Sequence, residues 1–366
     1  MNTKILKQKI LSELLTNNEW KTVKLGDVCE KICAGGDKPN CFSETKTETH
    51  PIPIFSNGIK DNGLYGYTDV STIKKPSVTI SARGTIGFTA IRREPFCPIV
   101  RLVSVTPKND ILDIDYLYYV LTAFIVKGEG SSIQQLTVPN VQPIEISLPS
   151  LAVQKQIVSQ IETLFAEIDR IEQSRQNLLQ TVKMARQKAL QEFLNGEWKT
   201  VKLGDVCEYG KCKTVITSDI HENAWILDLE DIEKDTGKLL HRIIKKEKNT
   251  TSVRYSFKKG NVLYSKLRTY LNKVLVADMN GFCTTEIIPI DFNGKVIPEF
   301  ARFVLMSPMF LEYTEQCCYG VKMPRLGAND AKKADFPLPP LPVQKQIVEK
   351  IEAVFGEIEK IERAII

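Results

Sequence analysis

An internal duplication constrains this chain more than any other feature. Residues 338–362 (LPPLPVQKQIVEKIEAVFGEIEKIE) repeat residues 148–172 (LPSLAVQKQIVSQIETLFAEIDRIE) at a constant offset. A second pair is identical, because EWKTVKLGDVCE occupies both residues 19–30 and residues 197–208. Self-similarity of this kind indicates repeated structural units. The chain is therefore expected to contain two copies of one unit, each made of a domain and a helix.

The longer helical copy lies in the middle of the chain. Its apolar residues recur in alternating steps of four and three, which is typical of a coiled-coil seam, and Arg175 fills the one gap. Pro149-Ser150 and Asn195-Gly196 are start and stop signals, so we expect one helix of about 44 residues and roughly 65 Å. Its single apolar stripe needs a partner, and the second copy is the expected one. The seam residues are Ile157, Ile161, Leu164, Ile168, Ile171, Leu178, Val182, Ala185 and Ala189.

The segments between the helices have a different pattern, with short apolar runs broken by Gly, Pro and Asn. Such runs are strand-like, whereas residues 111–126 and 298–306 have helical spacing. Strands are predicted at residues 51–55, 77–82, 85–91, 98–105, 261–267, 272–278 and 284–291. Each segment is therefore interpreted as a mixed α/β domain.

The predicted fold class is α+β. Two mixed α/β domains, residues 16–147 and 196–337, are separated by two long antiparallel helices that form a coiled coil, with pseudo-twofold symmetry. The spacer helices occupy residues 148–195 and 338–366. Residues 1–15 resemble the last third of the central helix, so they are expected to complete the distal one. The repeats are then circularly permuted, and the two termini are expected to be adjacent.

Composition narrows the class of protein only mildly. Hydrophobic residues make up 43% and charged residues 25%, which are ordinary values for a globular protein. The net charge of +5 favours an anionic partner slightly, although a solvated basic surface explains it better. No apolar run is long enough for a transmembrane helix. Nine cysteines, an odd number, favour reduced thiols and a cytoplasmic location.

Familiar catalytic motifs are missing from the sequence. There is no GxxxxGK[ST] loop, no glycine-rich cofactor turn and no Asp/Asn-Pro-Pro-aromatic tetrad of amino-methyltransferases. Three histidines, His50, His221 and His241, are too scattered for a catalytic triad or a zinc site. The acidic cluster around Asp228 is better explained as a charged surface than as a nuclease site. The chain is interpreted as non-catalytic, without a metal or cofactor of its own.

Two similar domains held by long helices suit an elongated, quasi-twofold ligand. A DNA site of roughly 13–15 base pairs spans about 45–50 Å, and a rigid spacer could place two readers on its two halves. Because the two domains differ in sequence, the two half-sites should differ as well. A two-headed scaffold that binds proteins is the alternative, and salt-sensitive binding to duplex DNA would separate the two hypotheses.

The whole pattern resembles the specificity subunits of type I restriction–modification systems. The resemblance rests on the paired helix starts LPSLAVQKQIV and LPPLPVQKQIV, the twin EWKTVKLGDVCE segments, ISARGTIG at residues 80–87 and VKMPRL at residues 321–326. It implies that each domain reads half of a bipartite, asymmetric DNA site, and that the helices set the spacing and dock two methyltransferase subunits. Those subunits would bind S-adenosylmethionine and methylate adenine, and restriction subunits would complete the assembly.

Candidate DNA contacts come from loops that correspond between the two repeats. Aligning residues 130–136 with residues 320–326 matches Ser132 with Lys322 and Gln135 with Arg325. Glutamine suits adenine and arginine suits guanine in the major groove, but these loops could instead only close the domain onto the helix. The full candidate set is Ser81, Arg83, Thr85, Ser132, Gln135, Ser265, Lys266, Arg268, Tyr270, Lys273, Lys322 and Arg325.

Overall fold

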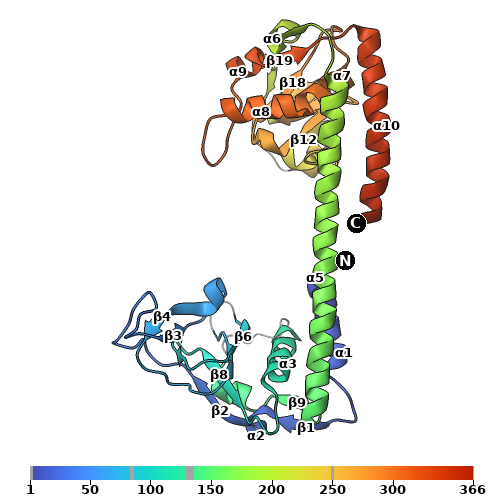
Figure 1. Cartoon of the computed structure of the whole chain (residues 1–366). Coiled ribbons are helices and arrows are strands. Elements are labelled where there is room, and N and C mark those ends of the chain that lie inside the picture. The colour runs from blue at the N-terminus through green and yellow to red at the C-terminus, as the bar shows by residue number, and fades with distance from the viewer. Residues whose placement is uncertain (1–2, 83–85, 128–135, 249–250, 366) are drawn as a thin grey trace. The chain divides into compact units, whose positions relative to one another are not determined.

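The computed structural model describes residues 3–82, 86–127, 136–248 and 251–365. The chain divides into two compact units, Met1–Ser174 and Arg175–Ile366, and each contains a mixed α/β body packed on helices (Figure 1). The expected mixed α/β architecture is therefore confirmed. Within the described residues, no helix has the length and hydropathy needed to span a membrane. The terminal residues 1–2 and 366 lie outside the described part, so the expected closeness of the termini stays a prediction.

The central helix, α5, spans Leu151–Leu194 and confirms the predicted rod. In the first unit, α1 (Thr3–Leu14) lies along α5, where Lys7 Nζ is 2.7 Å from Asp169 Oδ1. In the second unit, α10 (Leu341–Ile365) runs antiparallel beside the other part of α5 (Figure 1). Helix α5 thus pairs with both segments that the repeat assigns to the distal helix.

The apolar seam of α5 is buried only in part. Ile161 is fully buried and Ile168 nearly so, whereas Leu164, Ile171 and Leu178 are 43%, 59% and 52% exposed. The predicted continuous seam is therefore interrupted within the chain. Part of this exposure follows from length, because α1 has 12 residues and α10 has 25, against 44 in α5. Leu164, in contrast, is exposed although α1 lies along this part of α5.

The first unit contains a four-stranded sheet, β2-β8-β5-β6, a three-stranded sheet, β4-β3-β7, and a two-stranded pair, β1-β9. The helix α3 (Ile114–Lys127) packs against β5 and β6, as its predicted position suggested. The strands are β1 (Lys21–Lys24), β2 (Cys29–Ala34), β3 (Ile52–Phe55), β4 (Leu64–Thr68), β5 (Ser77–Ile80), β6 (Thr89–Arg92), β7 (Cys97–Pro98), β8 (Val103–Pro107) and β9 (Glu145–Leu148). The short helices are α2 (Leu25–Val28), η1 (Lys60–Gly63) and α4 (Val138–Val141).

The second unit has a five-stranded sheet, β11-β14-β17-β12-β13, a three-stranded sheet, β16-β15-β18, and a pair, β10-β19. The strands are β10 (Thr200–Lys202), β11 (Thr214–Val215), β12 (Trp225–Leu227), β13 (Ile243–Ile244), β14 (Arg254–Phe257), β15 (Val262–Ser265), β16 (Val274–Val276), β17 (Gly281–Thr284), β18 (Ile287–Ile290) and β19 (Asp335–Pro337). The helices are α6 (Leu203–Val206), η2 (Thr217–Asp219), η3 (Leu229–Asp231), η4 (Lys245–Glu247), η5 (Thr269–Leu271), α7 (Pro298–Met306), α8 (Pro308–Cys317) and α9 (Ala328–Lys333).

The two bodies share several strand pairings, in agreement with the duplication, although their sheets differ in strand number. In the first, β3 pairs in parallel with β7, and Ile54 lies opposite Cys97. In the second, β12 pairs in parallel with β17, and Ile226 lies opposite Phe282. The antiparallel pairs β5-β6 and β5-β8 likewise correspond to β15-β16 and β15-β18.

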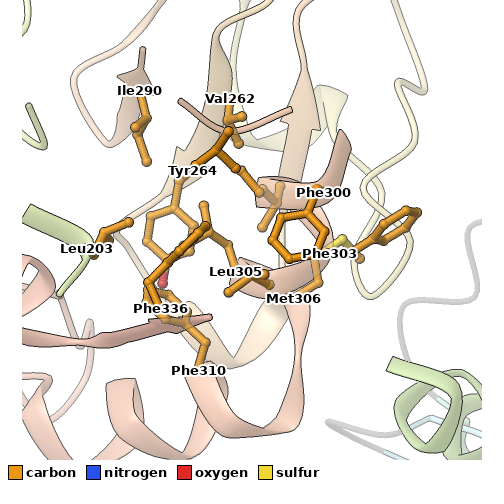
Figure 2. Close-up of a cluster of buried hydrophobic side chains, with 14 of the residues drawn as sticks. Leu203, Val262, Tyr264, Ile290, Phe300, Phe303, Leu305, Met306, Phe310 and Phe336 are labelled. Carbon is orange, nitrogen blue, oxygen red and sulfur yellow. The ribbon is translucent and has the colours of Figure 1, made fainter. Parts of the chain in front are cut away.

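The core of the second unit lies between the three-stranded sheet and helices α7 and α8. Figure 2 shows aromatic and aliphatic side chains from these elements meeting in one cluster. Tyr264 of β15 contacts Phe310 of α8 with ring centroids 5.6 Å apart, and Phe300 of α7 contacts Phe336 of β19 at 6.3 Å. Because interiors of this kind are close-packed, the cluster holds β15 and the loop that follows it at a fixed position.

One buried glutamine anchors each body to its helix. Gln154 is fully buried in α5, where its Oε1 accepts a hydrogen bond from Asp113 N and its Nε2 donates to Pro149 O. Gln344 of α10 accepts from Ile297 N and donates to Pro339 O in the same way. The first Gln of each QKQIV motif therefore satisfies main-chain groups just before the domain helix.

Several predicted strand bounds are wrong. The expected strand at residues 98–105 is broken by a turn in which Val100 and Arg101 have φ of 53° and 60°. The strand predicted at residues 261–267 ends at Ser265 in β15, because the chain turns at Arg268, which has φ 51°. Helix α8 was not predicted, although Ser307 caps it by accepting a hydrogen bond from Phe310 N.

Candidate nucleic-acid interface

In the second unit, the loop between β15 and β16 carries five of the predicted contacts. Ser265 N donates to Lys273 O and closes the loop at its base. Arg268 and Asn272 both adopt left-handed backbone conformations on either side of η5. The buried Asn272 donates from Nδ2 to Met306 O, which fastens the loop to α7. These contacts hold the loop at its base and on its core side.

A short hairpin lies beside this loop. Tyr319 and Arg325 exchange main-chain hydrogen bonds of 3.1 and 2.9 Å, and Gly320 has φ 97° at the bend. Arg268 N donates to Pro324 O at 2.7 Å, and Leu326 N donates to Lys266 O at 2.9 Å. These two bonds join the hairpin to the β15–β16 loop as one surface.

An ion pair fixes the base of the hairpin. The guanidinium of Arg325 donates from Nε and Nη2 to the carboxylate of Glu286, with distances from 2.9 to 3.2 Å. Both side chains are partly buried, at 34% and 24% exposure. In this structure Arg325 is therefore engaged within the protein, and a contact with guanine would require it to exchange partners.

The outer side of the two loops mixes positive, aromatic and apolar side chains. Arg268 and Lys322 are exposed. Tyr270 is 50% exposed, and Val321 at the hairpin tip is fully exposed. We call the exposed residues of the two loops the tip surface: Arg268, Tyr270, Tyr319, Val321, Lys322 and Met323. Cations suit phosphates and aromatic or apolar groups suit bases, so this composition fits a nucleic acid.

Two of the predicted residues in this loop point inward. Ser265 is buried, and its hydroxyl donates to Leu267 O at 2.9 Å. Lys273 Nζ donates to Leu229 O at 2.6 Å, and burial lowers the pKa of this lysine. Lys266 is half-buried, and its main chain links Glu286 and Leu326. In the structure the side chains of Ser265 and Lys273 therefore support the loop rather than face outward with the tip surface.

In the first unit, Ser81 occupies the same place as Ser265. It is 1% exposed, its N donates to Phe88 O, and its hydroxyl accepts from Gly58 N. Ser81 thus closes the loop between β5 and β6, and it is turned inward as well. The remaining predicted contacts of this domain lie outside the described residues, and they are Arg83, Thr85, Ser132 and Gln135.

The sequence did not indicate the turn at residues 99–102, which lies beside these loops. Arg101 is exposed there and lines a cavity of about 410 Å³. Ala82, which follows Ser81, and Leu136, which follows Gln135, line the same cavity. Arg101 was missed because it stands inside an apolar run that reads as one strand. Aligning the strand pairs of the two domains would have indicated it.

The acidic cluster predicted to be a charged surface is an internal ion network. Asp228 pairs with the buried Arg254 and with Lys248, which also contacts Glu230 at 3.0 Å. Burial opposes the charge on Asp228, but hydrogen bonds from Arg254 and Lys248 outweigh it and lower the pKa of the carboxyl. Among the described residues, no group of three or more His, Cys, Asp or Glu side chains could hold a metal ion.

Comparison with known families decides the identity. The model of the type I restriction modification DNA specificity domain matches residues 17–181 and again residues 195–366. The chain belongs to this family. It is a type I specificity subunit with two DNA specificity domains, and its role in such a system is recognition rather than catalysis.

Individual relatives agree with this assignment. The specificity subunit of the Escherichia coli enzyme EcoDI is 23% identical over 95% of this chain and 84% of its own length. A type I specificity subunit of Mycoplasma pneumoniae is 36% identical, over 42% of this chain and 47% of its own length. A chain from a structure on complex assembly of the type I R-M system superposes with a TM-score of 0.69, at 16% identity, over 95% of this chain and 93% of that one. That likeness extends the shared fold to nearly the whole chain.

Proposed function

We propose that each domain reads one half of a bipartite, asymmetric DNA site through its loop surface. The observation that carries this proposal is the tip surface, in which Arg268, Lys322 and the aromatic and apolar side chains project from two loops fastened to the core. Rigid support of projecting side chains lowers the entropy lost on binding. Charge and apolar groups together allow both phosphate contact and approach to base edges.

The supporting residues have a separate role in this proposal. Ser81 and Ser265 close corresponding loops, and the ion pair between Glu286 and Arg325 sets the hairpin against β15. We assign these four side chains to positioning. Arg83, Thr85, Ser132 and Gln135 remain proposed contacts of the first domain. Lys266 and Lys273 are proposed to support the loop and to add positive potential near the backbone of the DNA.

The catalytic partners belong to other chains in this proposal. Two methyltransferase subunits would dock on the helices and bind S-adenosylmethionine, and restriction subunits would join the larger complex. The supporting observation is that Leu164, Ile171 and Leu178 leave apolar surface of α5 uncovered in the chain alone. Exposed apolar patches on helices commonly mark sites of protein association.

The test is a methylation assay on genomic DNA with methylome sequencing. The purified chain with S-adenosylmethionine should transfer no methyl group, whereas adding the cognate methyltransferase should mark adenines in one bipartite motif. Duplex binding by the complex should weaken steeply as salt rises. Methyl transfer by the chain alone, or salt-independent binding to proteins without any DNA motif, would contradict the proposal. The latter result would favour the two-headed protein scaffold.

A further inference from the structure

The turn between β7 and β8 is strained where it carries Arg101. Val100 and Arg101 both have left-handed φ, at 53° and 60°, and Leu102 N donates to Ile99 O across the turn at 3.1 Å. Two-residue turns of this kind normally use Asn-Gly, because a β-branched residue at positive φ clashes with its own backbone. Strained backbone persists where its surroundings impose it, and it is concentrated at functional sites.

Hydrogen bonds from two sides impose this conformation. Val100 N donates to Gly36 O at 2.8 Å and Arg101 N donates to Gly35 O at 2.9 Å. From the opposite side, Asn57 Nδ2 donates to Val100 O at 2.7 Å. A side chain on Gly35 would put its Cβ 2.6 Å from the main chain of Pro98, so this close approach requires glycine. These contacts therefore hold the backbone of Arg101 in one conformation.

Arg101 is exposed, and it lines a cavity together with Ala82 and Leu136. The described residues that line this cavity contain no acidic side chain, and no ion pair of Arg101 is found in the described part of the chain. They are Ala34, Gly35, Ala82, Arg101, Leu136, Thr137, Val138 and Pro139. Among the described residues, the guanidinium of Arg101 therefore has no acidic partner.

The repeat shows what stands at this position in the other domain. Ile80 of β5 pairs with Val103 of β8, and Tyr264 of β15 pairs with Ile288 of β18. Arg101 lies two residues before Val103, and Glu286 lies two residues before Ile288. Arg101 and Glu286 therefore occupy equivalent positions. Glu286 is satisfied by Arg325, whereas Arg101 has the opposite charge. The two domains therefore differ in charge at one structurally defined point beside the loops.

We infer that Arg101 reads a guanine in the first half-site, which rests on the proposed function. A guanidinium donates two parallel hydrogen bonds to the O6 and N7 of guanine, and this is the commonest specific contact of proteins with DNA. A side chain on a fixed turn loses less freedom on binding than one on a mobile loop. In the second domain, Glu286 occupies the equivalent position and orients Arg325. The same position therefore has a different role in each domain.

The experiment compares complexes of the full chain with its methyltransferase partner. Arg101→Asn removes the guanidinium, and asparagine tolerates positive φ, so the melting temperature should be unchanged or slightly higher. Methylation of the wild-type site should fall by about 5- to 150-fold, and guanine preference should be lost at one position of the first half-site only. Arg101→Lys keeps the charge but not the paired donors, and it should lose the same preference.

Lys46→Asn is the matched control, because it removes one exposed positive charge elsewhere in the same unit. It should leave the motif unchanged. An unchanged motif in Arg101→Asn would overturn the inference, as would a lower melting temperature that accounts for the lost methylation. If Arg101→Asn weakened methylation equally on all sequences and Arg101→Lys restored it, Arg101 would contact phosphate, and the inference would also be overturned. If the wild-type complex marks no bipartite motif, the proposed function itself fails.

Discussion

At the level of single residues, Glu286 and Arg325 should act as one unit. Glu286→Gln and Arg325→Ala each break the ion pair that holds the hairpin, so each should reduce methylation through the second half-site. The pair is about a third exposed, so its effect on stability should be about 1 kcal/mol or less. The double variant should be hardly worse than either single one, a coupling that a double-mutant cycle of melting and methylation measures.

A different outcome would separate reading from positioning. If Arg325 itself grips guanine, Arg325→Ala should change the motif at one position, while Glu286→Gln should leave the motif intact. Equal effects of the two substitutions would favour positioning. A lower melting temperature of Arg325→Ala with an unchanged methylated motif would show that the hairpin does not read the DNA sequence.

The ion network around Asp228 gives a prediction about pH. Asp228→Asn leaves the buried Arg254 without its carboxylate, which should cost about 3 kcal/mol of folding free energy at neutral pH. Because the folded-state pKa of Asp228 lies below its ordinary value of 3.8, its contribution is complete above that value and is lost as pH falls through the folded pKa. The difference in melting temperature between wild type and variant should therefore shrink in strong acid. A constant difference across pH 2 to 7, with both proteins folded, would refute this assignment.

At the level of elements, the length of α5 is expected to set the gap between the half-sites. Seven residues inserted after Gln173 keep the apolar stripe in phase and lengthen the helix by about 10 Å, roughly three base pairs. Four residues advance the helix by about one turn but rotate the stripe, so that variant should be less stable. Methylome sequencing reads the gap directly. A folded seven-residue variant with the original gap would show that α5 does not determine spacing.

Elements with long periodicity were predictable from the sequence, whereas contacts between distant segments were not. The pattern of apolar steps gave α5, and the repeat gave its partners. The turn at Val100 and Arg101 was hidden, because neither residue is a turn former and the conformation is imposed by Gly35, Gly36 and Asn57. The pairing of Arg325 with Glu286 likewise depends on the turn between β17 and β18 lying beside the hairpin. Such tertiary contacts cannot be predicted from local sequence patterns.

At the level of the whole molecule, the two domains should act on separate halves of the site. Gln135→Ala in the first domain should alter the first half-site and leave the second as it was. Lys322→Ala, if the side chain touches phosphate, should weaken all sequences alike and reduce the salt slope by about one. Titrations at several salt concentrations, with methylome sequencing of both variants, check these outcomes. A motif change in both halves from either substitution would show that the readers are coupled.

The two-stranded pairs β1-β9 and β10-β19 bring the entry and exit of each domain together, as Lys21 lies opposite Leu148 and Thr200 opposite Pro337. Each domain is thus an insertion whose two ends meet in one two-stranded pair. The first strand of each pair, β1 or β10, lies in the same EWKTVKLGDVCE segment in both repeats, so the gene has two matching sites for recombination. One exchange in this segment and a second in the shared VQKQIV helix start, at residues 153–158 and 343–348, would replace a domain and leave the helices unchanged. Under the proposed function, such a replacement would change one half of the DNA site and leave the rest of the chain as it was.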